Sequence, residues 1–268
     1  MSSAMIPNQI LIERLAESFT KAFYDKHWPS EPALSVNSLS LAEAYAVQDR
    51  VEALRMERGE ELAGYKVGCT SNAIRRQFGL DEPISARLFH PHIYSAGATF
   101  CRQDFIKCAI EPEMVISVGV DLQGVGLSDD ELLDSMSWVG VGIELHHFKF
   151  WFDPPSSQEL ICSGGIHAGL MIGNAQIDPR QISFQRERFS VIQDGHLVTQ
   201  ADATEIMGGP LHSLRWLVDS LTRRGQYLAA GSLVIPGSPV ELVSINRDCE
   251  IRVVIEGVGE LLARFHSQ

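Results

Sequence analysis

Two glutamates separated by a single residue are the first side chains in this sequence that could do chemistry. Residues i and i+2 of a strand point to the same face, so Glu111 and Glu113 would present two carboxylates side by side. Apolar residues follow them directly, and the two charges repel unless a cation neutralises them. Ligation by oxygen alone favours Mg²⁺, Mn²⁺ or Ca²⁺ over zinc. On this spacing alone, two harmless acids at a solvent-facing strand end are the simpler interpretation.

A third acid, Glu144, lies inside the apolar segment 139–145. An unpaired charge buried in such a strand is costly, so Glu144 needs a cation or a basic side chain beside it. From the pattern alone, a structural salt bridge is as good an interpretation as a metal. Taken together with Glu111 and Glu113, however, Glu144 makes a metal site with three carboxylates the preferred hypothesis.

A lysine, Lys66, lies in the short apolar segment 64–68, which predicts a buried strand. A half-buried lysine can have a lowered pKa and act as an acid, a base or an electrostatic anchor. The alternative is a stem that lies along the surface with its charged end in water. Thr70 and Ser71 follow at the predicted start of a short helix, where the carboxylate of a substrate is favoured.

The histidines close to these segments have no single interpretation. By strand parity His146 would share a face with Glu144, and His147 would not. His167 lies among glycines. For each of them, a structural histidine with satisfied hydrogen bonds is the simpler interpretation. The glycine pairs of the chain fall short of a dinucleotide fingerprint, and the chain has no phosphate-binding loop or nucleophile motif.

The elements that must hold these residues change in type along the chain. Helical spacing and a capping box at Ser40 predict two helices in an N-terminal region, residues 1–60. Residues 61–268 form a predicted β-rich core in which two helices interrupt the strands, one after a capping box at Ser128 and one over about 211–224. The predicted strands are 64–68, 113–120, 139–146, 167–172, 232–235, 249–256 and 260–266. A helical start followed by many strands is typical of an α+β fold.

Composition limits the class of protein. The 268 residues are 45% hydrophobic and carry a formal net charge of -12, which argues against binding to nucleic acid or to an anionic membrane. No apolar run reaches the roughly 18 residues that span a bilayer, and no signal peptide is apparent. The five cysteines are odd in number and lack CxxC spacing. A reducing, cytoplasmic compartment is therefore expected.

Short motifs follow one another in order through nearly the whole chain. They are 42–48 (AEAYAVQ), 64–71 (GYKVGCTS), 79–83 (GLDEP), 110–113 (IEPE), 142–144 (GIE), 208–213 (GGPLHS) and 231–238. As a set they resemble the 2-keto-4-pentenoate hydratases, which stand with the 4-oxalocrotonate decarboxylases in the fumarylacetoacetate hydrolase superfamily. The resemblance implies a mixed β-roll core behind a helical N-terminal region.

The resemblance also implies a site and a reaction. Mg²⁺ or Mn²⁺ would be held by the acids at Glu111, Glu113 and Glu144, and would chelate the carboxylate and the 2-oxo group of a small 2-oxo acid. The metal would stabilise an enolate, with Lys66 moving a proton or holding charge. Such enzymes serve the catabolism of aromatic or related compounds, and a homo-oligomer is expected. The predicted substrate-binding residues are Thr70, Ser71, Arg87, Gly237 and Ser238.

The chain departs from the hydratase pattern where the substrate tail would lie. Ile84 stands where hydratases carry an aspartate, and there the decarboxylases are more similar. His147 and Lys149 replace an aspartate and an arginine, and His167 ends a rewritten stretch. His90, His92, His147 and His167 are the candidates for the missing acid–base function, and of these His147 and His167 are the predicted catalytic residues. The predicted reaction is hydration of a 2-hydroxy-2,4-dienoate. The alternatives are decarboxylation of a 4-oxalocrotonate-like acid, hydrolysis of a carbon–carbon bond in an acylpyruvate, and ligand binding without turnover.

Overall fold

The computed structural model describes residues 7–28, 34–152 and 155–268, and it begins with helices. These are α1 (Pro7–Asp25), the 3₁₀ helix η1 (Leu34–Ser38) and α2 (Leu41–Glu57). The capping box predicted at the start of α2 is present, because Ser40 Oγ accepts from the Glu43 N–H and the Glu43 carboxylate accepts from the Ser40 N–H at 2.8 Å. The helical start of the chain is therefore as predicted.

The larger sheet carries every segment that holds a candidate metal ligand. Its strands are β1 (Glu61–Gly68), β2 (Ile84–His90), β3 (Ile93–Ser95), β5 (Cys108–Val118), β6 (Met136–His147), β7 (His167–Ile172), β10 (Leu233–Ile235) and β11 (Val243–Ser244). They run in the order β2-β1-β10-β5-β6-β7-β3, and β11 pairs with the beginning of β5. Gly64 lets β1 and β10 approach closely, since a Cβ there would lie 1.8 Å from the Leu233 carbonyl oxygen.

A second sheet packs against the first and closes the main hydrophobic core. Its strands are β4 (Thr99–Cys101), β8 (Arg188–Gln193), β9 (His196–Asp202), β12 (Cys249–Ile255) and β13 (Gly259–His266), in the order β4-β13-β12-β8-β9. The predicted hairpin of β12 and β13 is present. Buried side chains such as Met114, Val141 and Val253 belong to the core cluster that both sheets share.

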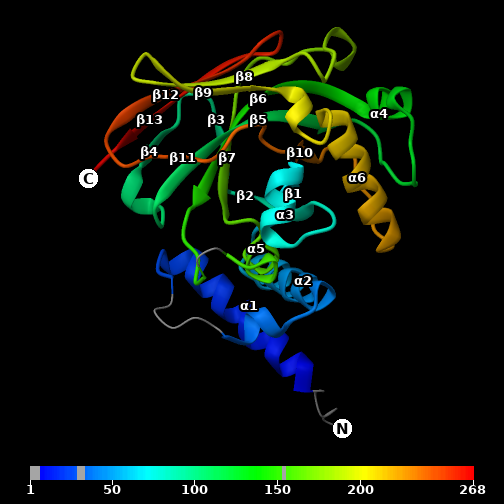
Figure 1. The fold of residues 1–268 in the computed structure, drawn as a ribbon, viewed down its shortest axis with the longest axis vertical. Coiled ribbons are helices and arrows are strands. Elements are labelled where there is room, and N and C mark those ends of the chain that lie inside the picture. Colours follow the sequence, from blue (N-terminus) through cyan, green and yellow to red (C-terminus); the bar gives the residue numbers. More distant parts are fainter. Residues whose placement is uncertain (1–6, 29–33, 153–154) are drawn as a thin grey trace.

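Helices cover the ends and one side of the sheets. They are α3 (Asn72–Phe78), α4 (Asp129–Ser135), α5 (Ser157–Cys162) and α6 (Pro210–Arg223), with short 3₁₀ turns η2 (Arg102–Asp104), η3 (Pro179–Gln181) and η4 (Ala203–Glu205). Figure 1 shows α1, α2 and α5 together at one end of the molecule, with the second sheet at the opposite end. Gln48 of α2 joins α5 by donating to the Ile161 carbonyl at 2.8 Å. α5, which lies about 100 residues after α2 in the chain, therefore completes the N-terminal helical layer.

The mixed sheets and the helical layer make this an α+β fold, as predicted. Within the described residues, no helix combines the length and the apolar character that crossing a membrane would require. The boundary at residue 60 stays a prediction, although β1 begins at Glu61.

Candidate metal and substrate site

The register of β5 and β6 brings the candidate acids together. Glu111 lies directly opposite Glu144, and Glu113 is two residues further along the same strand. Glu113 and Glu144 are buried, while the side chain of Glu111 is 18% exposed. Like charges directly opposite in a sheet destabilise it, and burial increases the cost. The sheet therefore concentrates negative charge at a point that requires cations.

Lys66 supplies one positive charge from β1. Its ammonium group donates to Glu144 Oε1 and lies 3.4 Å from the Gly165 carbonyl oxygen. Burial lowers the pKa of Lys66, but the charges of Glu144 and Glu111 outweigh burial and hold the pKa above its usual range. Of the roles open to a half-buried lysine, a charged electrostatic anchor therefore fits Lys66 better than a base with a lowered pKa.

Glu113 bonds to one predicted substrate-binding residue, Gly237, which in turn packs against another, Thr70. Its Oε2 accepts from the Gly237 N–H at 3.2 Å. Gly237 has a φ of +114°, and a Cβ there would lie 2.5 Å from Thr70 Cγ2, so only glycine fits against Thr70. Burial, followed by the charges of Glu144 and Glu111, holds the pKa of Glu113 well above its usual range. The neighbourhood of Glu113 is therefore one in which a bound cation would be favourable.

One histidine of this cluster was not among the predicted site residues. His146 is buried on β6, and its Nε2 lies 3.0 Å from Glu111 Oε2 and 3.5 Å from Glu144 Oε2. The parity argument that places His146 on the face of Glu144 is confirmed by these distances. Strand parity carries the signal for His146 in the sequence. The acid–base role of His147 stays a prediction.

His167, at the start of β7, binds the cluster from the next strand. Its Nδ1 lies 2.7 Å from Glu144 Oε1, and its Nε2 is buried without a hydrogen-bond partner in the described part of the chain. Burial lowers the pKa of His167 to about 4, although Glu144 opposes this. The ring is therefore neutral at pH 7, and Nδ1 must carry the proton because it faces a carboxylate. The lone pair of Nε2 remains free.

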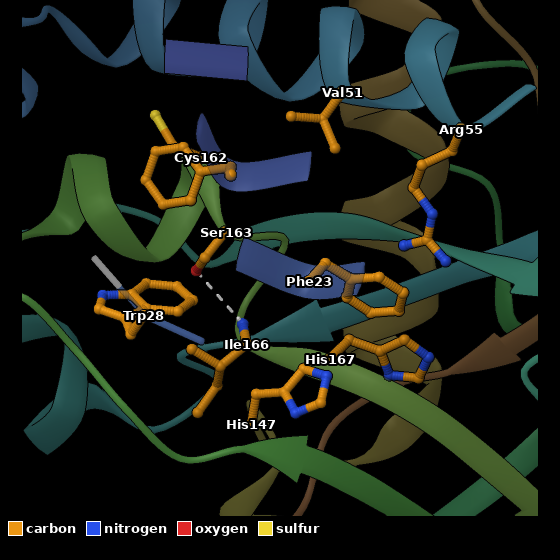
Figure 2. A pocket seen from close by; sticks show the side chains of 10 residues that line it. Phe23, Trp28, Val51, Arg55, His147, Cys162, Ser163, Ile166 and His167 are labelled. Carbon is orange, nitrogen blue, oxygen red and sulfur yellow. Dashed lines mark hydrogen bonds between the residues drawn. The ribbon is translucent and has the colours of Figure 1, made fainter. Parts of the chain in front are cut away.

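Two adjoining cavities lie on the other side of His167, between the helical layer and the sheet. Their volumes are about 390 and 340 Å³. Figure 2 shows Arg55 reaching in from α2, His147 and His167 on the opposite wall, and Phe23 between them. The residues that line both cavities are Val51, Arg55, Cys162, Ser163 and His167. His167 therefore connects the carboxylate cluster with the two cavities.

The other predicted site residues differ in their surroundings. Arg87 lines the second cavity, with its guanidinium held by Asp49 and Glu52. His147 lines the first cavity, and its Nδ1 accepts from the Ile106 N–H at 3.2 Å. Burial, then the charge of Lys26, lowers the pKa of His147 to about 3.

Two predicted substrate-binding serines lie in local backbone structure. The Ser238 hydroxyl donates to the Val240 carbonyl at 3.2 Å, within its own loop. The Ser71 carbonyl accepts from the Arg75 N–H in the first turn of α3. Neither serine lines the two cavities described above, and their substrate-binding roles stay predictions.

A buried ionic network supports the cavity wall. Glu60 accepts from Tyr24 at 2.6 Å and from Arg55 Nε at 2.6 Å, and lies 2.9 Å from His92 Nε2. The Arg55 guanidinium lies 4.2 Å from the centroid of the Phe23 ring. The network joins α1, α2 and the loop after β2, and so fixes the helical layer over the cavities.

Replacing Glu60 by Gln should therefore destabilise the fold. Burial raises the pKa of Glu60, but bonds from His92 and Tyr24 and the charge of Arg55 outweigh burial and lower it from 4.5 to about 2. The stabilisation is present above pH 4.5 and is lost as the pH falls toward 2. We expect Glu60→Gln to cost about 3 kcal/mol at pH 7, measured by urea unfolding, and much less near pH 2.

The matched control is Glu57→Gln, which removes an exposed partner of Arg50. It should cost about 0.5 kcal/mol or less. Equal losses in the two variants, or a loss in Glu60→Gln that does not shrink with acid, would contradict the role given to this network.

The donor set fits a divalent cation. Glu111, Glu144 and His146 each place one donor atom within 4.8 Å of the others'. Among the residues that the structure describes, Glu144 Oε2 and both nitrogens of His146 are buried without hydrogen-bond partners. Buried polar atoms are normally satisfied, so this donor set is suited to binding a cation. Glu113 lies beside this group, but neither of its carboxylate oxygens lies within 4.8 Å of all three donor atoms. The predicted set of three glutamates is therefore only partly assembled.

Known proteins similar to this chain fall into one group. No protein-family model matches it. The chain is 25% identical over 222 residues to a 2-keto-4-pentenoate hydratase of Burkholderia vietnamiensis (strain G4 / LMG 22486), covering 83% of this chain and 85% of that protein. It is 25% identical over 270 residues to a 4-oxalocrotonate decarboxylase of Pseudomonas sp. (strain CF600), covering 99% and 100%.

Solved structures show the same fold. A 4-oxalocrotonate decarboxylase from Pseudomonas putida G7, complexed with calcium and acetate, superposes with a TM-score of 0.89 at 21% identity, over 98% of this chain and 100% of that chain. A fumarylpyruvate hydrolase from Pseudomonas aeruginosa, in complex with Mn²⁺ and pyruvate, superposes with a TM-score of 0.61 at 19% identity, over 78% and 90%.

The fold is thus that of the fumarylacetoacetate hydrolase superfamily. In sequence, the chain is similar to 2-keto-4-pentenoate hydratases and to 4-oxalocrotonate decarboxylases, which agrees with the resemblance of its motifs.

Proposed function

We propose that this protein is a metal-dependent lyase that acts on a small unsaturated 2-oxo acid. The observation that carries the proposal is the buried cluster of Glu111, Glu113 and Glu144 with a single lysine among them. Such a cluster holds more negative charge than Lys66 can neutralise. The curated relatives bear the names of enzymes that act on acids of this class.

The metal proposed here is Mg²⁺ or Mn²⁺, held by the carboxylates of Glu111, Glu113 and Glu144. Structures of relatives contain calcium, magnesium or manganese, which fits carboxylate ligands. When bound, the cation would supply Lewis-acid polarisation of the carboxylate and 2-oxo oxygens of the substrate. Gly237, which bonds to Glu113, and Thr70, which packs against Gly237, are the proposed contacts for the substrate carboxylate.

Lys66 is the proposed electrostatic and proton-transfer residue. Its ammonium is buried and remains charged, so it can stabilise the negative oxygen of an enolate and then deliver a proton. Water is largely excluded from this position, which strengthens the interaction of a positive charge with a developing negative one.

Decarboxylation is the reaction that these residues suit best. It needs an electron sink at the 2-oxo group and a proton donor, and it needs no activated water. Ile84, at the position where the hydratases carry an acid, is buried beside Gly165, as is Lys66. An apolar wall at this place favours decarboxylation, because the charge of the departing carboxylate is transferred to the enolate as CO₂ leaves. The decarboxylase relatives also match this chain over nearly its full length.

Hydration of a 2-hydroxy-2,4-dienoate is the second candidate, and His167 is the observation that favours it. A neutral imidazole with a free Nε2, held at Nδ1 by Glu144, is equipped to take a proton from water in the adjoining cavity. His147, on the wall of the same cavity, is the alternative acid–base residue.

An assay with two substrates distinguishes the candidates. Purified protein with Mg²⁺ or Mn²⁺ is mixed with a 4-oxalocrotonate-like acid or a 2-hydroxydienoate, while CO₂ release and ultraviolet absorbance are followed. We expect CO₂ from the first substrate and loss of turnover when a chelator removes the metal. Loss of dienoate absorbance without CO₂ would favour hydration. Turnover that survives complete chelation would contradict the proposed metal dependence.

The cellular setting belongs to the same proposal. All five cysteines are free thiols, which fits a cytoplasmic location. A homo-oligomer stays a prediction from the family.

A further inference from the structure

We propose that His146 is a ligand of the metal, so that the site has mixed nitrogen and oxygen donors and prefers a first-row transition cation such as Mn²⁺ over Mg²⁺. The inference rests on the proposed metal site and adds to it a ligand from this chain that the three predicted glutamates do not include. Glu111 Oε2, Glu144 Oε2 and His146 Nε2 would form one face of the coordination sphere.

The geometry around His146 Nε2 carries the argument. This nitrogen lies 3.0 Å from Glu111 Oε2 and 3.5 Å from Glu144 Oε2, yet neither contact has the direction of a hydrogen bond. Adjacent ligands of an octahedral cation with bonds of about 2.1 Å lie ~3.0 Å apart. Donor atoms at this spacing, with lone pairs that do not point at each other's protons, fit a cation placed between them.

Burial keeps bulk water away from the His146 ring. The His146 side chain is 2% exposed, and neither of its nitrogens has a hydrogen-bond partner among the described residues. An imidazole without partners in a protein interior loses the hydration of both nitrogens. Binding of a cation by Nε2 would offset the loss of hydration at this nitrogen, which faces the carboxylates.

The sheet fixes the position of His146 on the metal side. It is two residues after Glu144 on β6, so both side chains share one face, and it pairs across the sheet with His167 of β7. His167 already bonds Glu144. The side chains of Glu144, His146 and His167 therefore lie around one point on the adjacent strands β6 and β7. Glu111 lies on the remaining side, on β5.

The chemistry of the donors sets the expected selectivity. Imidazole binds manganese, iron, cobalt and zinc more readily than magnesium, which prefers oxygen and keeps its water. Replacing His146 by Val should therefore lower the affinity for Mn²⁺ by about tenfold or more, and change the affinity for Mg²⁺ by less than about threefold.

The direct test is electron spin-echo modulation of Mn²⁺ bound to the full-length protein, which detects nitrogen coordinated to manganese. We expect ¹⁴N modulation in the wild type and its loss in His146→Val. The matched control, His212→Ala, removes an exposed histidine from α6 and should change nothing. Calorimetric titrations with Mn²⁺ and Mg²⁺ give the affinities, and circular dichroism of the metal-free variants verifies that they fold.

The outcomes separate this inference from the function on which it rests. Bound Mn²⁺ without nitrogen modulation, and with equal Mn²⁺ affinity in the wild type and His146→Val, would overturn the role of His146 and leave the carboxylate site intact. Failure of the wild type to bind either cation would overturn the proposed metal site itself. If His146→Val does not fold, His146→Gln offers the same comparison, because it keeps a polar side chain without an imidazole.

Discussion

Replacing Glu144 by Gln should abolish tight metal binding and lower kcat/KM by more than about 10³-fold. Glu144 is the acid on which the whole cluster converges: Lys66 and His167 both bond its Oε1, and Oε2 is left for a cation. A neutral amide cannot replace the charge in any of these contacts. The measurements are calorimetric titration with Mn²⁺ and steady-state kinetics.

The matched control for this variant is Glu159→Gln. Glu159 of α5 is just as deeply buried, but it accepts from the backbone N–H groups of Trp151 and Phe152 rather than from the cluster. It should lose stability and retain metal affinity. If Glu159→Gln lost the metal as completely as Glu144→Gln, the loss would reflect general damage to the fold.

The second large effect is expected at Lys66. Lys66→Met should lower kcat by about 10²- to 10⁴-fold, because it removes the charge and the proton that face the enolate. Metal affinity should rise at the same time, since the cation no longer competes with an ammonium bonded to Glu144. The metal-free variant should be about 3 kcal/mol less stable, because Glu144 loses its partner, and added Mn²⁺ should restore this loss.

Lys66→Arg separates charge from proton transfer. Arginine keeps the positive charge but does not release its proton, so it should preserve most of the stability and little of the turnover. A parallel fall in metal affinity and kcat in Lys66→Met would contradict the account, because it would make Lys66 part of the support of the metal ligands.

The parts of the fold that depend on local pattern could be predicted from sequence. The β7 strand has the predicted bounds, and both capping boxes form, because strand periodicity and capping depend on residues a few positions apart. The hairpin of β8 and β9 was not predicted. Its second strand is largely exposed and lacks a clear apolar alternation, so the pattern that identifies strands is weak there.

The site could be predicted from sequence where spacing within a single strand determines which side chains share a face. Spacing within β5 and β6 placed Glu113 and Glu144, and parity placed His146. The pKa of Lys66 was not predictable, because it depends on the register of β1 against strands far along the chain. Arg55 was missed for the same reason, since only the packing of α2 over the sheet brings it to the cavity.

The central claim is that a divalent cation binds among Glu111, Glu113 and Glu144. Anomalous diffraction from crystals grown with Mn²⁺ tests it most directly. The account predicts one manganese peak per chain, within about 2.3 Å of carboxylate oxygens of Glu111 and Glu144, with Glu113 turned toward it. A fully occupied peak elsewhere, with these carboxylates bonded only to Lys66 and His167, would contradict it.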